Sequence, residues 1–398
     1  MVASSAQRQV TSGLALSPAR RAAGGLVLAG AALIAACGAP TAGGAGASAP
    51  SGGPAGAGHA AAASGGAGGG ATRVVHIECG DHHACAVMGD GSVACWGHDD
   101  EGQLGDGGGA ARPRPTKVPG LSGVREIALS RTLGCALGVD KSVRCWGTGR
   151  ALGGQAMTRA PATVMGGLRA SELSASGVTA CGREEGGAFR CWGSAKGLPD
   201  LGGDVVSLAV AATHVCALRR DGSVRCAGAE HWGGAGRDSL NRPLLPAAAS
   251  PPGEIATGDA FACALGKDKK VYCWGQNDLG QLGLPPDFVV HDVPAPVPGL
   301  ANVESLSLGE ASACALGGGR VTCWGANPTG ELGLGRASPH ERPTVVPALA
   351  GVKDVCFASS SACALTTDDA MVCWGDNSQG QLGDGTKRAS LAPVRVAF

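Results

Sequence analysis

One short unit recurs seven times between residues 73 and 398, and this repeat constrains the fold more than any other feature of the chain. Each unit carries two cysteines separated by nine residues, or by eight in the sixth unit. Six of the seven tryptophans directly follow the second cysteine of a unit. The units begin 35 to 51 residues apart, which predicts a repeat architecture. The pairs are Cys85 with Cys95, Cys135 with Cys145, Cys181 with Cys191, Cys216 with Cys226, Cys263 with Cys273, Cys314 with Cys323, and Cys363 with Cys373.

The residues within each unit favour short strands. An apolar segment such as 124–127 precedes Cys-Ala-Leu, a turn rich in Asp and Gly, Val-x-Cys-Trp-Gly, a Gly-rich loop and a Pro-x-x-Val segment. Apolar residues alternate, and no long stretch keeps a helical period. Gly and Pro in every unit disfavour pairs of helices. Four strands in each of seven units predict an all-β fold, a seven-bladed β-propeller over residues 73–398.

Two units depart from this pattern. Four of the other units continue into Gly-Gln-Leu-Gly or Gly-Glu-Leu-Gly, at residues 102–105, 280–283, 330–333 and 380–383. The third unit is short and lacks this loop, and the fourth reads Cys226-Ala227-Gly228 with Trp232 displaced downstream. We therefore expect the least regular blades around residues 181–250.

These motifs resemble the repeats of the regulator of chromosome condensation family, whose seven-bladed propellers carry similar Cys-Ala-Leu, Trp-Gly and Gly-Gln-Leu-Gly elements. The resemblance covers residues 73–398, and the cysteine pairs look like the exported bacterial branch of that family. It implies a propeller that acts as an interaction module. Eukaryotic relatives exchange nucleotide on a small nuclear GTPase. That role is not carried over to this chain. An exported protein would not meet a nuclear GTPase, and no inserted hairpin of the kind that performs the exchange is evident.

The two ends of the repeat region predict how the ring closes. Residues 393–398 match the last segment of a unit, and residues 73–77 match the first segment of the next. We expect the chain to start and stop in the middle of a blade, with both ends in one sheet. Such pairing would cover edges that are otherwise exposed. Deleting residues 391–398 should then destabilise the whole ring.

The paired cysteines are predicted to form disulfides. Cys85 and Cys95 are symmetric about Asp90 in the turn, so they lie opposite each other in a hairpin, with Cβ atoms about 4.5–5.5 Å apart. That separation is close to disulfide reach. The alternative is metal binding, but zinc sites usually need a second, closely spaced cysteine pair nearby, and none occurs. Seventeen cysteines also argue against a reducing cytosol.

Cys79 and Cys356 remain once the seven pairs and Cys37 are assigned. Both precede the first cysteine of their unit by six or seven residues, on the expected innermost strand. They belong to the first and last units, which become neighbours when the ring closes. We therefore predict a Cys79–Cys356 bridge between the first and last blades. The alternative is a pair of free buried thiols.

The N-terminal residues predict export and lipid anchoring. Residues 1–21 contain three arginines and no acid, and residues 22–36 are apolar or glycine, as in a secretory signal. The sequence Leu33-Ile34-Ala35-Ala36-Cys37 resembles a bacterial lipobox, which implies cleavage after residue 36 and lipidation of Cys37. The alternative is an ordinary signal peptide with an incidental cysteine. Residues 37–72, rich in Gly, Ala, Ser and Pro, read as a disordered linker.

No group of residues in the sequence predicts a catalytic site, a cofactor site or a metal site. The chain has zero net charge, which argues against nucleic-acid binding. His76, His82, His83 and His98 lie close in sequence, but we expect His83 to be structural. Asp106 and Asp384 are expected to form turns, because the spacing of a calcium loop is absent. Ser, His and acidic residues do not gather at a recurring position.

Our functional expectation is a non-enzymatic, lipid-anchored binding protein of the cell envelope, at the outer membrane or cell surface. It would be a monomer that binds an unidentified protein and touches the membrane only through the lipid on Cys37. The first alternative is a secreted-type inhibitor of an enzyme, for which exposed aromatic anchors would be the sign, with Phe288 and Trp232 as candidates. The second is an enzyme or ligand site at the central mouth of the propeller.

Overall fold

The computed structural model describes residues 73–148, 157–164, 167–177, 179–184, 187–193, 205–211, 214–219, 221, 223–228 and 253–398. The expected signal (1–36), linker (37–72), Cys37 and Trp232 therefore lie outside the described residues. The described residues form strands, turns and loops, and they contain no helix that is long and apolar enough to cross a membrane.

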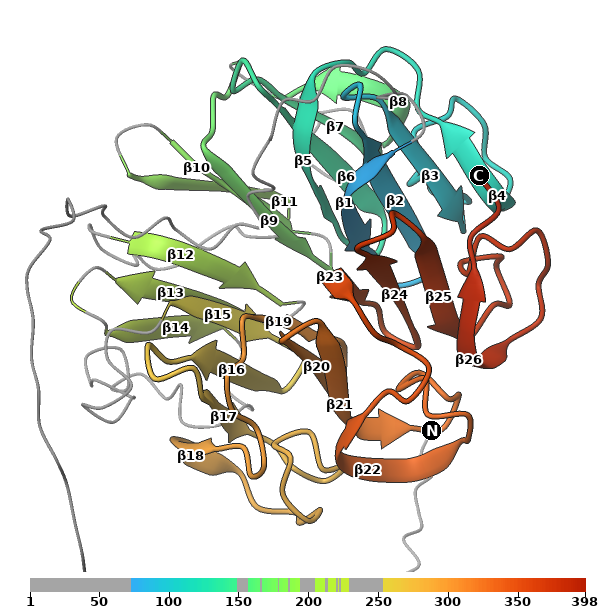
Figure 1. Ribbon diagram of the computed structural model, residues 1–398. Helices are drawn as coiled ribbons and strands as arrows, with labels where there is room; N and C mark the ends of the chain where they lie inside the picture. Colours follow the sequence, from blue (N-terminus) through green and yellow to red (C-terminus); the bar gives the residue numbers. More distant parts are fainter. Residues whose placement is uncertain are drawn as a thin grey trace, which may run out of the picture. The chain divides into compact units, whose positions relative to one another are not determined.

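The described strands form seven antiparallel sheets, each built from one repeat unit (Figure 1). The first strands of the seven sheets are β1 (Val74–Cys79), β5 (Val124–Leu129), β9 (Glu172–Ser176), β12 (Val205–Val210), β15 (Glu254–Thr257), β19 (Ser305–Leu308) and β23 (Val352–Phe357). The second strands are β2 (His83–Met88), β6 (Leu133–Gly138), β10 (Thr179–Arg183), β13 (His214–Arg219), β16 (Phe261–Leu265), β20 (Ser312–Gly317) and β24 (Ser361–Thr366).

The third and fourth strands complete the blades. The third strands are β3 (Val93–Gly97), β7 (Val143–Thr148), β11 (Phe189–Gly193), β14 (Val224–Gly228), β17 (Val271–Gly275), β21 (Arg320–Asn327) and β25 (Met371–Gly375). The fourth strands are β4 (Arg112–Lys117), β8 (Met157–Thr163), β18 (His291–Pro296), β22 (Ser338–Val345) and β26 (Ser390–Arg395). Blades three and four have three strands each among the described residues.

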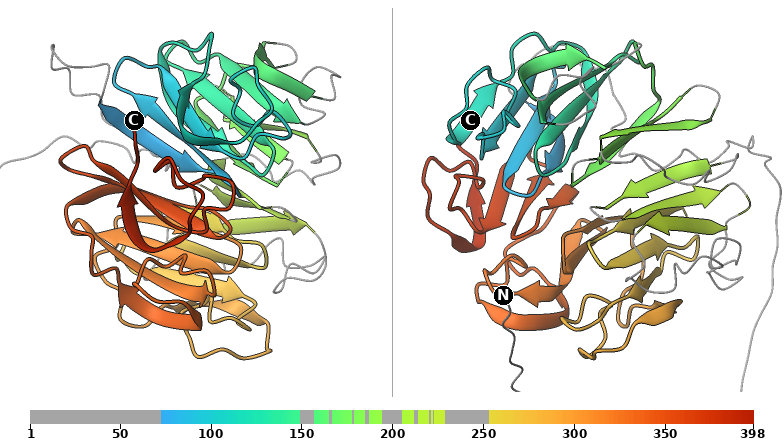
Figure 2. Two further views of the ribbon diagram at one scale, coloured as in Figure 1. Left: turned by 90° about the vertical axis from the view of Figure 1, so that its right-hand side faces the viewer. Right: turned by 180° about the vertical axis from the view of Figure 1, so that it is seen from behind.

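The first strands of all seven blades contact one another around a common centre, so the chain is the predicted seven-bladed β-propeller (Figure 2). In each blade the second and third strands pair as a hairpin with the expected register, in which Cys85 faces Cys95.

All seven hairpin pairs are disulfides in the structure, with Cα atoms 4.0–4.1 Å apart. A further disulfide joins Cys79 to Cys356, across the joint between the first and last blades. The hairpin bonds join Cys85 to Cys95, Cys135 to Cys145, Cys181 to Cys191, Cys216 to Cys226, Cys263 to Cys273, Cys314 to Cys323, and Cys363 to Cys373.

The expectation that both chain ends share one sheet is wrong. Strand β26 pairs with β25 in the seventh blade, and β1 pairs with β2 in the first blade. β26 is the outermost strand of its sheet and β1 the innermost strand of the next, so the two strands cannot pair. Each described sheet is built from strands of a single unit, and the ring closes through contacts between sheets and the Cys79–Cys356 disulfide.

A tryptophan, a glutamine carbonyl and a glycine form a repeated contact between neighbouring blades. The indole nitrogen of Trp146 in the second blade donates a hydrogen bond of 2.7 Å to the carbonyl oxygen of Gln103 in the first. Gly105 has a φ of +68°, and a Cβ there would lie 2.7 Å from the Trp146 ring. The Gly-Gln-Leu-Gly loop therefore needs its last glycine for close packing on the next blade. The equivalent indole bonds are Trp324 to Gln281, Trp374 to Glu331 and Trp96 to Gln381.

Candidate functional site

The centre of the propeller holds a small polar cavity. It measures about 180 Å³ and is lined by residues from all seven first strands. Glu78, Glu126 and Glu172 are among its lining residues, together with His76. A second cavity of about 130 Å³ continues along the same strands and is lined by Asp81, among other residues. Ligand pockets are usually about 300–1,000 Å³, so neither cavity suits a drug-sized ligand.

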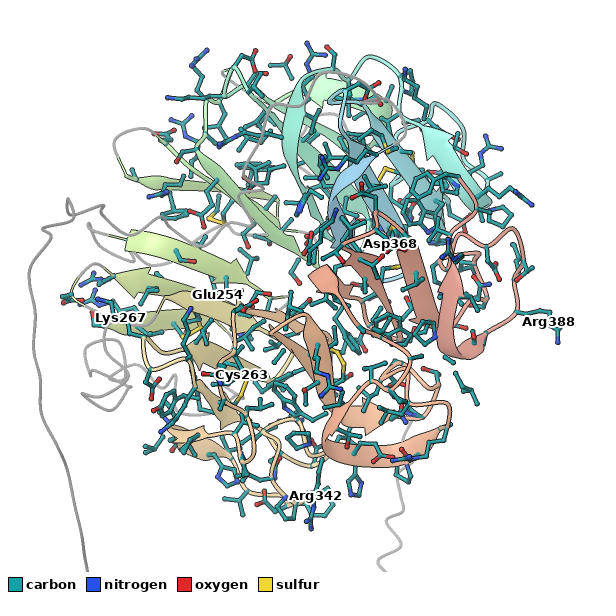
Figure 3. The ribbon with its side chains drawn as sticks, viewed as in Figure 1. Glu254, Cys263, Lys267, Arg342, Asp368 and Arg388 are labelled. Atoms are coloured by element: carbon teal, nitrogen blue, oxygen red, sulfur yellow. A yellow bond between two sulfur atoms is a disulfide. The ribbon has the colours of Figure 1, made fainter. Side chains whose placement is uncertain are left out.

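Acidic side chains recur at one position of the first strands, which the sequence analysis missed. Glu126 of the second blade accepts a hydrogen bond of 2.8 Å from the backbone nitrogen of Leu173 in the third. Glu254 and Asp354 accept equivalent bonds of 3.4 Å from the blade that follows each of them. Figure 3 shows Glu254 toward the centre of the ring. The sequence pattern that could have revealed this position is an acidic residue two residues after the valine that begins a unit, as in Val124 and Glu126.

These carboxylates serve the structure first. Each carboxylate accepts a hydrogen bond from a backbone N–H that has no partner strand. Leaving such a buried N–H without an acceptor costs about 1–3 kcal/mol. Burial lowers the pKa of His76, but the adjacent Asp354 carboxylate, 3.3 Å from Nδ1, more than compensates and leaves that pKa above its usual value. Burial raises the pKa of Glu172 to about 7, although Arg183 lies 3.1 Å away and opposes the shift. His76, Glu126 and Glu172, which line the cavity, are thus engaged in ion pairs and inter-blade bonds.

The histidine-rich start of the first blade does not gather around a metal position. His83 is fully buried, and neither of its ring nitrogens has a hydrogen-bond partner among the described residues. Burial lowers the pKa of His83 to about 3. His98 instead contacts Asp100 at 3.0 Å and Gln103 at 2.9 Å.

The predicted turn aspartates accept backbone hydrogen bonds within their own turns. Asp106 accepts a bond of 2.7 Å from Gly108, and Asp384 accepts one of 2.8 Å from Thr386. Within the described ranges, the group with metal-like spacing is Cys79, Cys356 and Cys363, whose sulfur atoms all lie within 4.8 Å of one another. All three are disulfide-bonded in the structure.

The most exposed apolar surface of the described residues lies in the fifth blade, on the loop before β18 and on β18 itself. Phe288 is 97% exposed, and Val289, Val290 and Val293 are 60%, 41% and 74% exposed. We call these four residues the apolar tip. Leu279, which is 40% exposed, lies on the same loop region of the fifth blade, and the other exposed large apolar residues, such as Val139, lie on other blades. A contiguous exposed apolar patch is a common mark of an interaction site.

Internal hydrogen bonds hold the loop that carries the apolar tip. The side-chain amide of Asn277 donates a bond of 2.7 Å to the carbonyl oxygen of Pro285, and its backbone carbonyl accepts one of 3.0 Å from Asp287. The Asp287 carboxylate lies 3.1 Å from Nε2 of His291. The apolar tip is therefore displayed on a fixed loop, which reduces the ordering entropy lost on binding. Of the two anchors expected from the sequence, the structure places Phe288 here.

The charged residues that flank the apolar tip in the sequence are acidic. Asp287 precedes Phe288, and the exposed Asp292 precedes Val293. Arg342 lies on β22 of the neighbouring sixth blade and Arg388 lies in the seventh blade, both at the outer edge of the ring (Figure 3).

Comparisons with known proteins match the repeats. Two family models described as the regulator of chromosome condensation (RCC1) repeat match the chain, one at residues 74–103, 254–281 and 352–381 and the other at residues 90–137 and 268–316. The ultraviolet-B receptor UVR8 of Arabidopsis thaliana is 24% identical over 220 residues, which are 53% of this chain and 43% of that protein. The human E3 ubiquitin-protein ligase HERC2 is 28% identical over 251 residues, which are 61% of this chain and 5% of the ligase.

Solved structures show the same fold. Human WBSCR16 superposes with a TM-score of 0.63 at 21% identity, covering 77% of this chain and 95% of that one. The ectodomain of the Arabidopsis thaliana receptor kinase ACR4 gives a TM-score of 0.50 at 19% identity, over 82% of this chain and 99% of that one. The chain thus spans less than half of the two curated relatives but nearly all of these two propellers.

Proposed function

Because the chain carries regulator of chromosome condensation repeats that form a seven-bladed propeller, we propose that it is a non-enzymatic binding protein of the cell envelope. Its disulfide-stapled propeller holds another protein through the apolar tip. The ubiquitin ligase is an enzyme, but this chain spans only 5% of its length, so that activity is not carried over.

The exposure of Phe288 is the observation that carries this proposal. An aromatic side chain that is 97% exposed on a fixed loop can insert into a partner's pocket as an anchor residue. The flanking Asp287 and Asp292 complement a basic rim and disfavour an anionic lipid surface. The partner is therefore a protein with an apolar, positively rimmed pocket.

Export and lipid anchoring complete the proposal. Eight disulfides among the described residues are typical of a protein that folds outside the reducing cytosol. In this proposal residues 1–36 direct export, Cys37 carries the lipid, and residues 37–72 separate the lipid from the propeller. Labelling with palmitate should be lost in Cys37→Ser, whereas unchanged labelling would refute the anchor.

The binding proposal is tested by capture with the oxidised full chain as bait and envelope extract of the source cells as prey. We expect one saturable, near-stoichiometric protein, whose retention falls at least tenfold with Phe288→Asp. Val139→Asp is the matched control, because Val139 is 72% exposed but lies alone on a turn of the second blade. Both variants should melt at the wild-type temperature. Equal retention by both would refute the role of the apolar tip.

The inhibitor alternative uses the same surface and differs only in its partner. If the captured protein were an enzyme whose activity falls when the full chain is added, the inhibitor function would replace the scaffold function. If no protein were captured and a small molecule were retained instead, the protein-binding proposal would be refuted, and a ligand or enzyme site at the centre of the propeller would be favoured.

A further inference from the structure

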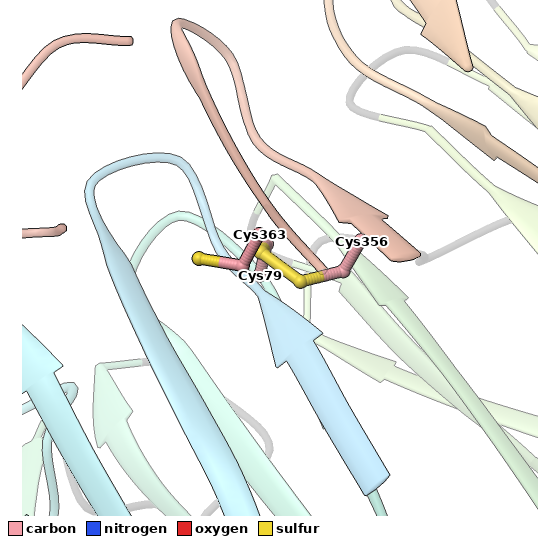
Figure 4. A group of neighbouring side chains, drawn as sticks. All are labelled: Cys79, Cys356 and Cys363. Carbon is pink, nitrogen blue, oxygen red and sulfur yellow. A yellow bond between two sulfur atoms is a disulfide. The ribbon is translucent and has the colours of Figure 1, made fainter. Parts of the chain in front are cut away.

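Four cysteines form a row across the joint between the first and last blades. Cys356 on β23 lies directly opposite Cys363 on β24, and Cys363 lies directly opposite Cys373 on β25. Cys79 on β1 extends the row into the first blade (Figure 4). The structure bonds Cys79 to Cys356 and Cys363 to Cys373. We call these four residues the cysteine row.

The cysteine row is specific to the seventh blade. In every blade the first cysteine of the hairpin faces one residue of the innermost strand. In the other six blades that residue is Glu78, Ala128, Ser174, Ala209, Ala256 or Ser307. Only in the seventh blade, among these described pairs, is it a cysteine. A disulfide therefore has a third cysteine beside it at this one place.

The geometry allows Cys356 two bonding partners. The sulfur atoms of Cys79, Cys356 and Cys363 all lie within 4.8 Å of one another. Cys363 and Cys373 have Cα atoms 4.0 Å apart, as in a non-hydrogen-bonded pair. The next pair, Cys356 and Cys363, is then of the hydrogen-bonded kind, with Cα atoms about 5.5 Å apart. That spacing falls within the disulfide range of about 4.4–6.8 Å.

Access to the cysteine row decreases from the centre of the ring outward. Cys79 is 9% exposed and lines the smaller central cavity. Cys356 is 4% exposed, and Cys363 and Cys373 are 2% and 0% exposed. A thiol that enters the ring at its centre therefore meets the Cys79–Cys356 bond first.

We infer that the cysteine row is a site of thiol–disulfide exchange, which moves the staple between the first and last blades into the seventh blade. An external thiolate attacks Sγ of Cys79 and forms a mixed disulfide, and the Cys356 thiolate leaves. That thiolate attacks Sγ of Cys363, forms Cys356–Cys363 and expels the Cys373 thiolate. The Cys373 thiolate then takes up a proton from solvent. This balances the proton that the external thiol released when it became the attacking thiolate. One thiol is consumed and one appears, so no oxidant is needed.

The substrate is a small-molecule or protein thiol outside the cytosol. After the exchange, the first and last blades are joined only by non-covalent contacts such as the bond between Trp96 and Gln381. The seventh blade keeps one internal disulfide, so it remains cross-linked while the joint is released. A second thiol that attacks the mixed disulfide at Cys79 would free that residue without reversing the transfer.

A full-length Cys79→Ser variant tests the second step directly, because Cys356 then starts as an unpaired thiol. The protein is held at pH 8, quenched with acid and unfolded in excess alkylating reagent, and the labelled peptides are mapped by mass spectrometry. We expect label at both Cys356 and Cys373, with at least a tenth of the molecules carrying Cys356–Cys363. The second cysteines of the other blades, such as Cys323, serve as internal controls and should stay unlabelled. Label at Cys356 alone would overturn the inference.

Limited reduction of the wild-type full chain makes the test independent of the variant's folding. With less than one equivalent of a small thiol, we expect early label at Cys373 and a mixed disulfide at Cys79. Release of Cys356 as a free thiol, with Cys363–Cys373 intact at all times, would overturn the inference. Either result leaves the binding role of the apolar tip unaffected.

Discussion

The indole nitrogen of Trp96 in the first blade donates a hydrogen bond of 3.0 Å to the carbonyl oxygen of Gln381 in the last. The same bond links three other pairs of neighbouring blades, and the joint where the chain ends meet carries the Cys79–Cys356 disulfide in addition. The side chain of Phe398 packs edge-on against Trp96, with ring centroids 6.0 Å apart. Figure 1 shows the chain end beside β4, in the first blade.

Replacing Gly383 by alanine should destabilise this joint. Gly383 has a φ of +67°, and a Cβ there would lie 2.7 Å from Nε1 of Trp96. We expect a loss of about 2–4 kcal/mol, from the left-handed backbone and from overpacking. Gly107 has a similar φ of +84° but open space around it, so Gly107→Ala should lose only about 1–2 kcal/mol. Equal losses in denaturant unfolding would contradict the packing role.

Deleting residues 391–398 should lower the melting temperature of the whole ring. The deletion removes most of β26 and the apolar residues Val394 and Val396, which pack against the core cluster that contains Trp96. Point variant Phe398→Ala isolates the ring contact and should have a smaller effect. A truncated chain that melts at the wild-type temperature would show that the joint does not depend on this segment.

Substitution at Glu126 tests the structural role of the central carboxylates. Glu126→Ala leaves the backbone nitrogen of Leu173 without its acceptor, and we expect a loss of about 1–3 kcal/mol in urea unfolding. Glu126→Gln keeps an oxygen acceptor in place and should lose less. If both variants unfold like the wild type, the carboxylate is free to serve a ligand instead.

The stability of the ring should fall in acid because of buried histidines. Burial lowers the pKa of His83 from 6.5 to about 3, so the unfolded chain takes up a proton there that the folded chain excludes. This contribution to stability is present above pH 6.5 and is lost as the pH falls toward 3. Burial lowers the pKa of His214 to about 3 as well, with the same sign.

Replacing His83 by leucine should reduce this acid sensitivity. Leu133 begins the equivalent strand of the second blade, so leucine fits the position. Between pH 6 and 4 the free energy of unfolding should fall less steeply with pH in the variant than in the wild type, by about 1.4 kcal/mol per pH unit. His340→Leu, at an exposed site, is the control and should keep the wild-type slope. Thermal unfolding between pH 4 and 8 measures all three proteins, and parallel curves would refute the assignment.

The hairpins and the propeller could be predicted from the sequence because two cysteines with nine residues between them fix a register, as at Cys85 and Cys95. Ring closure could not be predicted from the similarity of the end segments, because that pattern does not show that β26 is outermost and β1 innermost. The grouping of exposed apolar residues in the apolar tip could not be predicted either. It depends on the path of the loop, which the hydrogen bonds of Asn277 hold and which leaves Phe288 facing solvent. The central acids were overlooked because their position holds Glu, Asp, Ser or His in different blades.

The bond between Cys79 and Cys356 also determines how the ring carries mechanical tension. The two residues are 277 positions apart in sequence, and most of the propeller lies between them. A force that pulls on both ends of the ring passes through this covalent link, so the enclosed blades bear none of it. Only the segments outside the bond, which include β24, β25 and β26 of the seventh blade, can lengthen under load. A stretched molecule would therefore keep most of its blades folded until a thiol cuts the link.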